Sequence, residues 1–380
     1  MNLCFWWSLV SQHQSAYVRE LAHENDVVVV AERQVSDDRK QLGWSVPELG
    51  KARIVIDPTQ SQVQKLLRES GERIHILQGW KGCRLSRQVL SSPSRPSRLG
   101  VVVEACDERG ARGFARTMYY RALLANPHSK VDFVLSMGSM GETYYRKRGI
   151  QPNCLFPFCY TVERREVTSD FARQLDADDK VHVSYIGQLC ERKAVDILLR
   201  ALHSNSRLDW QLDLVGDGPQ MRELRHLCTF LNMEGRVHFR GTMDHRSALD
   251  CLSASDLLVL PSRFDGWGAV VNEALMLGVP VVCTDRCGAS DLIRAPWLGS
   301  VVKAGSVSSL AEALGEWIRR GKKTSMQSEH IRDWTESIEG PYVAHYFSAV
   351  LEHVYYGAPR PVAPWRTCVA APKQMPDVVI

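Results

Sequence analysis

Two carboxylates with glycines between them mark the segment 257–293, LLVLPSRFDGWGAVVNEALMLGVPVVCTDRCGASDLI. Asp265 closes an apolar run typical of a buried strand, and Glu273 lies in the helix predicted after it. Gly266 and Gly268 leave room for a ligand to reach the backbone. A strand that leads through a loop into a helix points backbone N–H groups at anionic ligands. The pattern predicts a ligand site, and incidental surface carboxylates are the alternative.

This segment resembles the donor-sugar site of the retaining glycosyltransferases of the GT-B fold, family 4. That family carries two acids separated by seven residues, between an S-x-x-E-G-x-G-like turn and an E-A-x-x-x-G-x-P-V run. The matching residues are Ser262, Asp265, Gly266, Gly268, Glu273, Ala274, Gly278, Pro280 and Val281. Asp265 stands where the family usually has Glu, which keeps the carboxylate but shortens its reach by one methylene.

Four further segments match the same family in the same order. The first is 183–196, where the family has G-R-L-x-x-x-K-G and contacts the donor diphosphate through its Arg and Lys. Lys193 falls on the Lys, whereas Gln188 falls on the Arg and Ala194 on the Gly. The second is 214–219, which contains Gly216; in the family this turn borders the nucleotide pocket. The third is 237–241, which contains Arg240; in the family its loop frames the nucleotide base. The fourth is 254–257.

The resemblance implies a role for each matched residue. Lys193 would stabilise the negative charge that builds on the departing nucleoside diphosphate, and Glu273 would accept hydrogen bonds from the ribose hydroxyls. Asp265 would contact the sugar. The other expected donor contacts are Gly187, Gln188, Gly216, Arg240, Gly266, Trp267, Gly268 and Val270. The same resemblance implies retention of anomeric configuration without a metal ion or another cofactor.

The N-terminal half offers fewer candidates. Glu104 ends an apolar run, at a position where many relatives have a His, and clefts lie at the carboxyl ends of such strands. It is therefore a candidate catalytic residue, with a helix-capping acid as the open alternative. His13 is either a site residue or a structural one. The loop 8–15 that contains it, SLVSQHQS, lacks the glycines that family members often have after the first strand.

Two basic clusters in this half are suited to an anionic acceptor or to lipid headgroups. The first, with arginines at helical spacing and apolar residues beside them, comprises Arg109, Arg112, Phe114, Arg116 and Met118. The second is 146–148, RKR. A solvated helix face with local ion pairs is the alternative interpretation of both.

Length and composition fit a globular protein of two domains. The chain has 380 residues, 44% of them hydrophobic and 24% charged, and a net charge of +4, which is too small to indicate nucleic acid. No apolar run approaches the roughly 18 residues of a membrane helix, and the first residues lack the basic flank and cleavage site of a signal peptide. The eleven cysteines form no C-x-x-C pair. We expect a cytoplasmic protein, with peripheral contact at the inner face of the membrane as a further expectation.

Apolar runs alternate with helical stretches, which predicts an α/β chain with two Rossmann-like doubly wound parallel-sheet domains facing a cleft. The expected strands of the first sheet are 3–7, 27–31, 74–77, 100–104 and 131–136, and those of the second are 181–186, 210–215, 236–239, 257–261 and 279–284. We expect an acceptor-binding domain over 1–165 and a nucleotide-sugar-binding domain over 166–340. A helix over 341–357 would cross back to the first domain, and a proline-rich tail over 358–380 would be extended and loosely packed.

Together the patterns predict an enzyme that moves a sugar from a nucleotide sugar to a glycan or lipid-linked acceptor, in surface polysaccharide or glycolipid biosynthesis. Two alternatives stay open. A nucleotide-sugar epimerase of the same fold would need an acid–base pair at the sugar C2, beyond the residues already assigned. A non-catalytic scaffold is favoured by Gln188, Ala194 and the glycine-poor first loop. The sequence specifies neither the sugar, nor the nucleotide, nor the acceptor.

Overall fold

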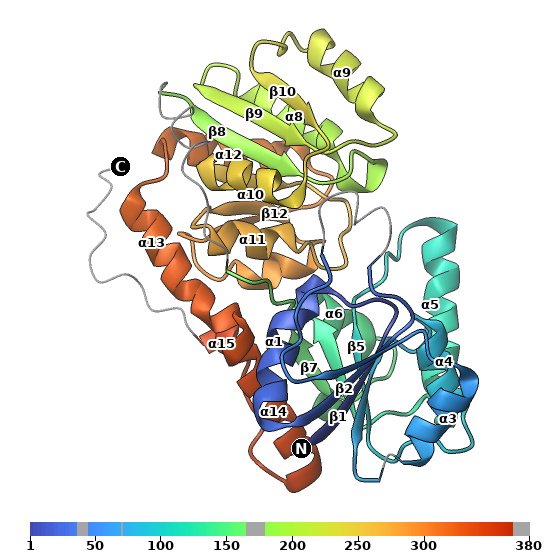
Figure 1. Ribbon diagram of the computed structural model, residues 1–380. Coiled ribbons are helices and arrows are strands. Elements are labelled where there is room, and N and C mark those ends of the chain that lie inside the picture. The colour runs from blue at the N-terminus through green and yellow to red at the C-terminus, as the bar shows by residue number, and fades with distance from the viewer. Residues whose placement is uncertain (36–44, 70, 165–178, 368–380) are drawn as a thin grey trace.

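The computed structural model describes residues 1–35, 45–69, 71–164 and 179–367. It confirms the predicted α/β class, because two parallel sheets form two lobes with helices on their faces (Figure 1). The N-terminal sheet has the order β3-β2-β1-β4-β5-β6-β7. Its strands are β1 (Asn2–Trp7), β2 (Asp26–Ala31), β3 (Arg53–Ile56), β4 (Ile74–Gln78), β5 (Leu99–Val103), β6 (Phe133–Met137) and β7 (Leu155–Phe158).

The C-terminal sheet has the order β10-β9-β8-β11-β12-β13. Its strands are β8 (Val181–Ile186), β9 (Trp210–Val215), β10 (Val237–Gly241), β11 (Leu257–Leu260), β12 (Val281–Thr284) and β13 (Gly299–Val302). In each lobe the strand order reverses direction once, between β1 and β4 and between β8 and β11. Ligand crevices form at such switch points, outside the carboxyl ends of the strands.

Each of the ten predicted strand runs overlaps an observed strand, and the sequence analysis missed β3, β7 and β13. All three are only four residues long. The side chains of β3 are exposed or half-buried at the sheet edge. Pro157 interrupts the apolar pattern of β7, and Gly299 begins β13, so neither strand has the continuous β-branched run that marks a buried strand.

Helices cover both faces of the two sheets. Those of the N-terminal lobe are α1 (Gln12–Glu24), α3 (Gln60–Arg68), α4 (Arg84–Ser91), α5 (Gly110–Ala125) and α6 (Gly138–Arg146). The C-terminal lobe has α8 (Val195–Ser204), α9 (Met221–Phe230), α10 (His245–Ala254), α11 (Val270–Met276), α12 (Val307–Arg320) and α13 (Ser325–Trp334). The chain continues through α14 (Gly340–Tyr356) to α15 (Pro364–Thr367).

Helix α14 runs from the C-terminal lobe down onto the N-terminal lobe, where it packs beside α1 (Figure 1). Phe347 of α14 contacts Phe5 of β1 and Tyr17 of α1, with ring centroids 5.8 and 5.9 Å apart. The hydroxyl of Tyr346 donates to the backbone oxygen of Pro157 at 3.0 Å. These buried contacts fasten the end of the chain to the first lobe.

The prediction of an extended, loosely packed tail is wrong for residues 363–367, which include the short helix α15. Trp365 is buried, and its indole N–H donates to Asp291 at 3.3 Å. The guanidinium of Arg366 binds Asp291 at 2.9 Å and Glu142 of α6 at 2.6 Å. Burial of the large Trp ring outweighs the turn-forming prolines around it. The contacts join both lobes, and residues 368–380 lie outside the described part of the chain.

Candidate functional site

A cleft of about 310 Å³ lies between the two lobes, at the carboxyl ends of their strands. The N-terminal lobe contributes Ser11, His13, Gln78, Glu104 and Tyr160, and the C-terminal lobe contributes Lys193, Asp265, Gly268 and Val270. Glu104, Lys193 and Asp265 carry the predicted catalytic roles, and they follow β5, β8 and β11. Ser11 follows β1 and Gln78 ends β4, so the switch points of both sheets face the same space.

Lys193 and Asp265 form an ion pair in this cleft. Lys193 ends the 3-10 turn η3 (Glu191–Lys193) after β8, and Asp265 lies in the loop after β11 with 9% of its surface exposed. The N–H of Asp265 donates to the backbone oxygen of Arg286 at 2.8 Å, which holds the loop in place. Arg192 lies 3.6 Å from the other carboxylate oxygen of Asp265. Two cations therefore surround one carboxylate.

Glu104 directly follows β5 and faces the same loop from the opposite lobe. The hydroxyl of Tyr160 donates to its carboxylate, and the hydroxyl of Tyr145 donates to its backbone oxygen at 2.9 Å. A Cβ on Gly266 would lie 2.0 Å from the Glu104 carboxylate, so a larger residue there would displace the Glu104 side chain. Glu104 is therefore in the cleft, and the N-cap position of helix α5 is occupied by Arg109 without a side-chain capping hydrogen bond.

The surroundings of Glu104 shift its pKa upward. The side chain meets solvent through the cleft, but protein atoms surround it on most sides, and this desolvation is the largest cause of the rise. The negative charge of Asp265 raises the pKa further. The hydrogen bond from Tyr160 and the charge of Arg192 oppose the shift. A carboxyl group with a raised pKa in a cleft is a frequent property of functional sites.

His13, which the sequence left open between two interpretations, lies in the cleft at the start of α1. Its ring stacks on Tyr160 with centroids 5.5 Å apart, and its N–H donates to the capping hydroxyl of Ser11 at 3.2 Å. The glycine-free loop before it is held by Gln78, whose side-chain oxygen accepts from the N–H and the hydroxyl of Ser8 at 2.8 and 2.9 Å. Side-chain hydrogen bonds thus fix this loop.

Glu273 faces a second hollow of about 280 Å³. Its carboxylate pairs with the Nε2 atom of His245, the first residue of α10, at 3.0 Å. Gln12, His13 and Arg19 line the hollow from the N-terminal lobe. Because His13 lines both hollows, the two acids of the motif lie in separate but adjoining spaces on either side of it.

Gly187 and Gly216 lie side by side, after β8 and β9. A Cβ on Gly216 would lie 2.1 Å from the backbone oxygen of Gly187, so the two loops touch through their backbones. The side chain of Gln188 is exposed beside them. Ala194 adopts the left-handed conformation, with φ 55° and ψ 39°, which glycine adopts most easily. The turn that the family makes with Gly is therefore present here with Ala.

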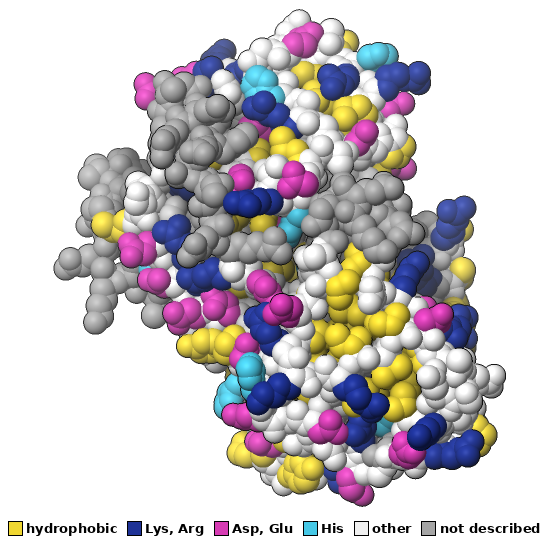
Figure 2. Space-filling model, in the orientation of Figure 1, with side chains coloured by type: hydrophobic (Ala, Val, Ile, Leu, Met, Phe, Trp, Pro, Cys, Tyr) yellow, Lys and Arg dark blue, Asp and Glu magenta, His cyan; other side chains and the backbone are white. Residues whose placement is uncertain are grey.

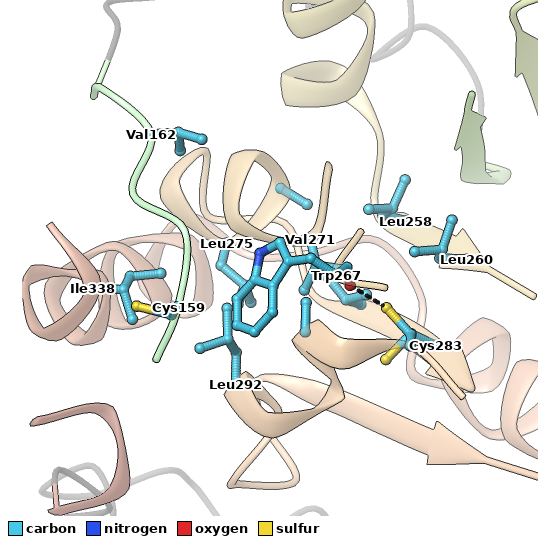
Figure 3. Close-up of a cluster of buried hydrophobic side chains, with 14 of the residues drawn as sticks. Cys159, Val162, Leu258, Leu260, Trp267, Val271, Leu275, Cys283, Leu292 and Ile338 are labelled. Carbon is cyan, nitrogen blue, oxygen red and sulfur yellow. Dashed lines mark hydrogen bonds between the residues drawn. The ribbon is translucent and has the colours of Figure 1, made fainter. Parts of the chain in front are cut away.

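Arg240 and Trp267 are predicted ligand contacts whose side chains are engaged elsewhere. Arg240 donates to the buried carboxylate of Asp213 on β9 at 2.6 Å. The indole of Trp267 is 1% exposed and lies among Leu275, Leu292, Cys159 and Ile338 (Figure 3). Its N–H donates to Asn272 at 2.7 Å, and the Asn272 amide donates to the backbone oxygen of Tyr160 at 2.9 Å. Trp267 therefore supports the cleft from within the core, because its ring is not presented to a ligand.

Four residues of the site were not predicted: Tyr160, Gln78 and Ser11, which line the cleft, and His245, which lines the second hollow. Gln78 could have been found from the sequence, because it is a polar residue that ends an apolar strand. Glu104, which directly follows β5, was found by the same pattern. Ser11 is a helix-capping type before α1. Tyr160 follows the missed strand β7, and His245 follows an ordinary Asp cap, so neither carries a local signal.

Residues 167–334 match the family model of glycosyl transferases group 1. The C-terminal domain is therefore similar to the group 1 glycosyltransferases. The matched range contains Lys193, Asp265 and Glu273. It also contains Gly187, Gly216 and the loop of Gly266 and Gly268.

Curated relatives match this chain over less than half of its length. The chain is 31% identical to alpha-D-kanosaminyltransferase of Streptomyces kanamyceticus over 139 residues, which are 36% of each protein. It is 32% identical to the lipopolysaccharide core biosynthesis glycosyltransferase LpsE of Rhizobium meliloti over 156 residues, 41% of this chain and 44% of LpsE. The matches thus span less than half the length of these relatives.

The fold of the whole chain is shared with solved structures. The crystal structure of Anabaena HepE in complex with UDP superposes with a TM-score of 0.68 at 18% identity, and the match covers 93% of this chain and all of HepE. This likeness extends over both lobes. The segment that matches the group 1 model therefore lies in the C-terminal half of a GT-B fold.

Proposed function

We propose that the protein is a retaining glycosyltransferase that moves a sugar from a nucleotide-sugar donor to a glycan or lipid-linked acceptor. The observation that carries the proposal is the meeting of Glu104, Lys193 and Asp265 in one cleft between the lobes. The similarity of the C-terminal domain to the group 1 family supports the reaction class. The UDP bound by HepE supports a nucleotide-sugar donor, and the role of LpsE in lipopolysaccharide core synthesis supports a surface glycan or glycolipid pathway.

Lys193 carries the main electrostatic task in this proposal. When the bond between the sugar C1 and the donor phosphate breaks, the departing diphosphate gains negative charge, which a positioned ammonium stabilises. Its ion pair with Asp265 orients Lys193 before the donor enters, and the phosphate then competes with the carboxylate for the same N–H donors. Arg192, 3.6 Å from Asp265, supplies the second cation, so Gln188 need not carry a charge.

Glu104 and Asp265 bring two carboxylates into the cleft, where the sugar C1 would lie in this proposal. The sugar C1 gains positive charge as the leaving group departs, and carboxylates near it stabilise that charge. The backbone of Gly266 and Gly268 lies beside them for contact with sugar hydroxyls. We assign the ribose to Glu273, whose carboxylate accepts from paired hydroxyls and is oriented by His245. The nucleoside would then occupy the hollow beside the cleft.

The proposal requires no metal ion, because Lys193 and Arg192 neutralise the diphosphate. It includes peripheral contact with an anionic membrane, where a lipid-linked acceptor would reside. No helix in the described part of the chain is long and apolar enough to cross a bilayer.

A donor panel tests the reaction class. The pure protein is incubated with UDP-, GDP- and ADP-sugars, and release of the nucleoside diphosphate is followed with and without a simple glycoside acceptor. We expect release of the nucleoside diphosphate with at least one donor, and slower release by Lys193→Ala. The anomeric proton of the product should show the same NMR coupling as that of the donor sugar, which indicates retention of configuration. Binding of a nucleoside diphosphate without turnover of any donor would indicate a scaffold. Interconversion of unreacted donor sugars would indicate an epimerase.

A further inference from the structure

Helix α5 exposes large apolar side chains along the outer edge of the N-terminal lobe. Of its sixteen residues, all of them described, only Gly113 is buried. Phe114, Met118 and Tyr119 are 68%, 50% and 41% exposed. Three such side chains within six positions of one helix form a cluster, whereas isolated exposed apolar residues are ordinary on protein surfaces.

The exposed apolar side chains of α5 share one face. At about 100° per residue, Phe114, Met118 and Tyr119 fall within an arc of roughly 140° that points away from buried Gly113. The small residues in the same arc are Ala111, Ala115, Ala122 and Ala125, which are also exposed. Arg112 falls near one margin of the arc and Arg121 on the other. We call this set of seven apolar residues with its flanking arginines the α5 face.

The charges within helix α5 have one sign. The sequence of α5 contains Arg112, Arg116 and Arg121 and neither Asp nor Glu. From the loop after β4, the ammonium of Lys81 lies 4.7 Å from the centre of the Tyr119 ring. Dark blue Lys and Arg side chains follow the edge of the molecule where α5 lies (Figure 2). Any partner of this face must therefore combine an apolar layer with negative charge around it.

We propose that the α5 face docks the protein onto an anionic membrane surface. A helix with aromatic and aliphatic residues in the centre and arginines at the margins lies in the plane of the interface, its apolar side among the acyl chains and its cations at the lipid phosphates. A second copy of the chain fits less well, since a two-fold contact would place arginines against arginines. A nucleic acid would leave the apolar centre of the face unused.

Docking on α5 would place the bilayer beside an opening into the space between the lobes. Arg109, which caps α5, lines a groove of about 1020 Å³ together with Asp107 and Lys147 of its own lobe and Phe264 and Arg286 of the other. Phe264 of this outer groove immediately precedes Asp265 of the cleft in the chain. Resting on the proposed function, this arrangement favours an acceptor that is held in the membrane, with its hydroxyl entering through the outer groove.

Vesicle sedimentation with the full chain tests the inference. Vesicles of phosphatidylcholine alone are compared with vesicles containing about one third phosphatidylglycerol, at low salt and at about 0.5 M salt. We expect binding to the anionic vesicles only, weakened by salt. The double variants Phe114→Ser/Met118→Ser and Arg112→Glu/Arg121→Glu should each reduce the partition coefficient about tenfold or more.

Matched controls lie on the other lobe. Phe230 and Met326 are 79% and 69% exposed, so Phe230→Ser/Met326→Ser removes comparable apolar surface, and Arg200→Glu/Arg222→Glu makes the same change of charge. These controls should bind vesicles as the original protein does. Equal binding by the α5 variants, or no binding to anionic vesicles at low salt, overturns the proposal. So does binding of an oligonucleotide, or dimerisation, that depends on the α5 residues while vesicles are ignored.

Nucleotide binding separates this inference from the proposed function. Since the substituted residues of α5 line neither of the hollows that hold Lys193, Asp265 and Glu273, UDP binding by calorimetry and release of the nucleoside diphosphate in solution should be unchanged in the α5 variants. Loss of vesicle binding in the α5 variants, with unchanged release of the nucleoside diphosphate, supports the docking surface. If the original protein binds vesicles but releases no nucleoside diphosphate from any donor, the docking surface stands and the enzymatic proposal is rejected.

Discussion

The ammonium of Lys193 donates to the carboxylate of Asp265, although the two residues follow different strands and are separated by 72 positions in the chain. Strands β8 and β11 are neighbours at the switch point of the C-terminal sheet, so their loops meet. The pair means that each residue determines the orientation of the other. Removal of one changes the charge balance of the cleft as well as its own contact with a ligand.

Replacement of Lys193 by alanine should lower the rate of sugar transfer at least about tenfold, because the leaving diphosphate loses its main cation. The measurement is kcat/KM from release of the nucleoside diphosphate. Lys303→Ala, which removes an exposed lysine of the same lobe, is the control and should be unchanged. Asp265→Asn should lower kcat/KM less in the Lys193→Ala protein than in the original protein, because the two residues act as a unit. Full activity of Lys193→Ala would exclude it from the site.

The raised pKa of Glu104 predicts an acidic limb in the pH dependence of transfer. If its carboxylate stabilises positive charge at the sugar, activity falls as pH drops through a pKa higher than that of an ordinary glutamate. Tyr160→Phe removes a hydrogen bond that lowers this pKa, so the limb should move to higher pH. Glu104→Gln should abolish the limb and slow the reaction at neutral pH. An unshifted limb in Glu104→Gln would assign the titration to another group.

Glu273→Ala should weaken binding of UDP about tenfold or more, because a carboxylate that accepts from two ribose hydroxyls is lost. His245→Ala should have a smaller effect, since His245 acts by orienting Glu273. Calorimetry gives both dissociation constants directly. Glu316→Ala removes an exposed carboxylate from α12 and is the matched control. Equal affinities in Glu273→Ala and the control would place the ribose elsewhere.

Trp267→Ala should lower the free energy of unfolding by about 3–5 kcal/mol, the usual range for loss of a buried aromatic ring. Trp267→Phe keeps most of the ring but loses the donor to Asn272, at about 1 kcal/mol. Denaturant unfolding measures both. Because Asn272 also binds the backbone of Tyr160, the Phe variant should show slower transfer with nearly unchanged UDP affinity. A Trp267→Ala protein that is as stable as the original but binds UDP more weakly would show instead that the indole contacts the ligand.

Chelation should leave the reaction unchanged, because the proposal assigns the diphosphate to Lys193 and Arg192. Transfer is measured after dialysis against EDTA and again with Mg²⁺ or Mn²⁺ restored. UDP binding by calorimetry under the same conditions provides a readout independent of turnover. A requirement for either ion in both assays would show that these two cations are insufficient.

The sequence by itself determined the fold class and much of the donor motif. Alternation of apolar runs with helical stretches is a local property, since each strand of a parallel sheet must be apolar on both faces. The loop glycines and the spacing of Asp265 and Glu273 are local as well. The proline-rich tail shows the limit of composition, because burial of Trp365 depended on a partner, Asp291, far away in the chain.

Only the tertiary structure decided which side chains share the cleft. Glu104 joins Asp265 because the ends of β5 and β11 face each other across two lobes, which no pattern along the chain encodes. The buried carboxylate of Asp213 holds Arg240, and the core takes the ring of Trp267, although both residues stand in the matching motifs. The role of the arginines in α5 could not be decided from the sequence for the same reason. Whether an apolar face is covered depends on what packs against it, and the fold leaves that of α5 in solvent.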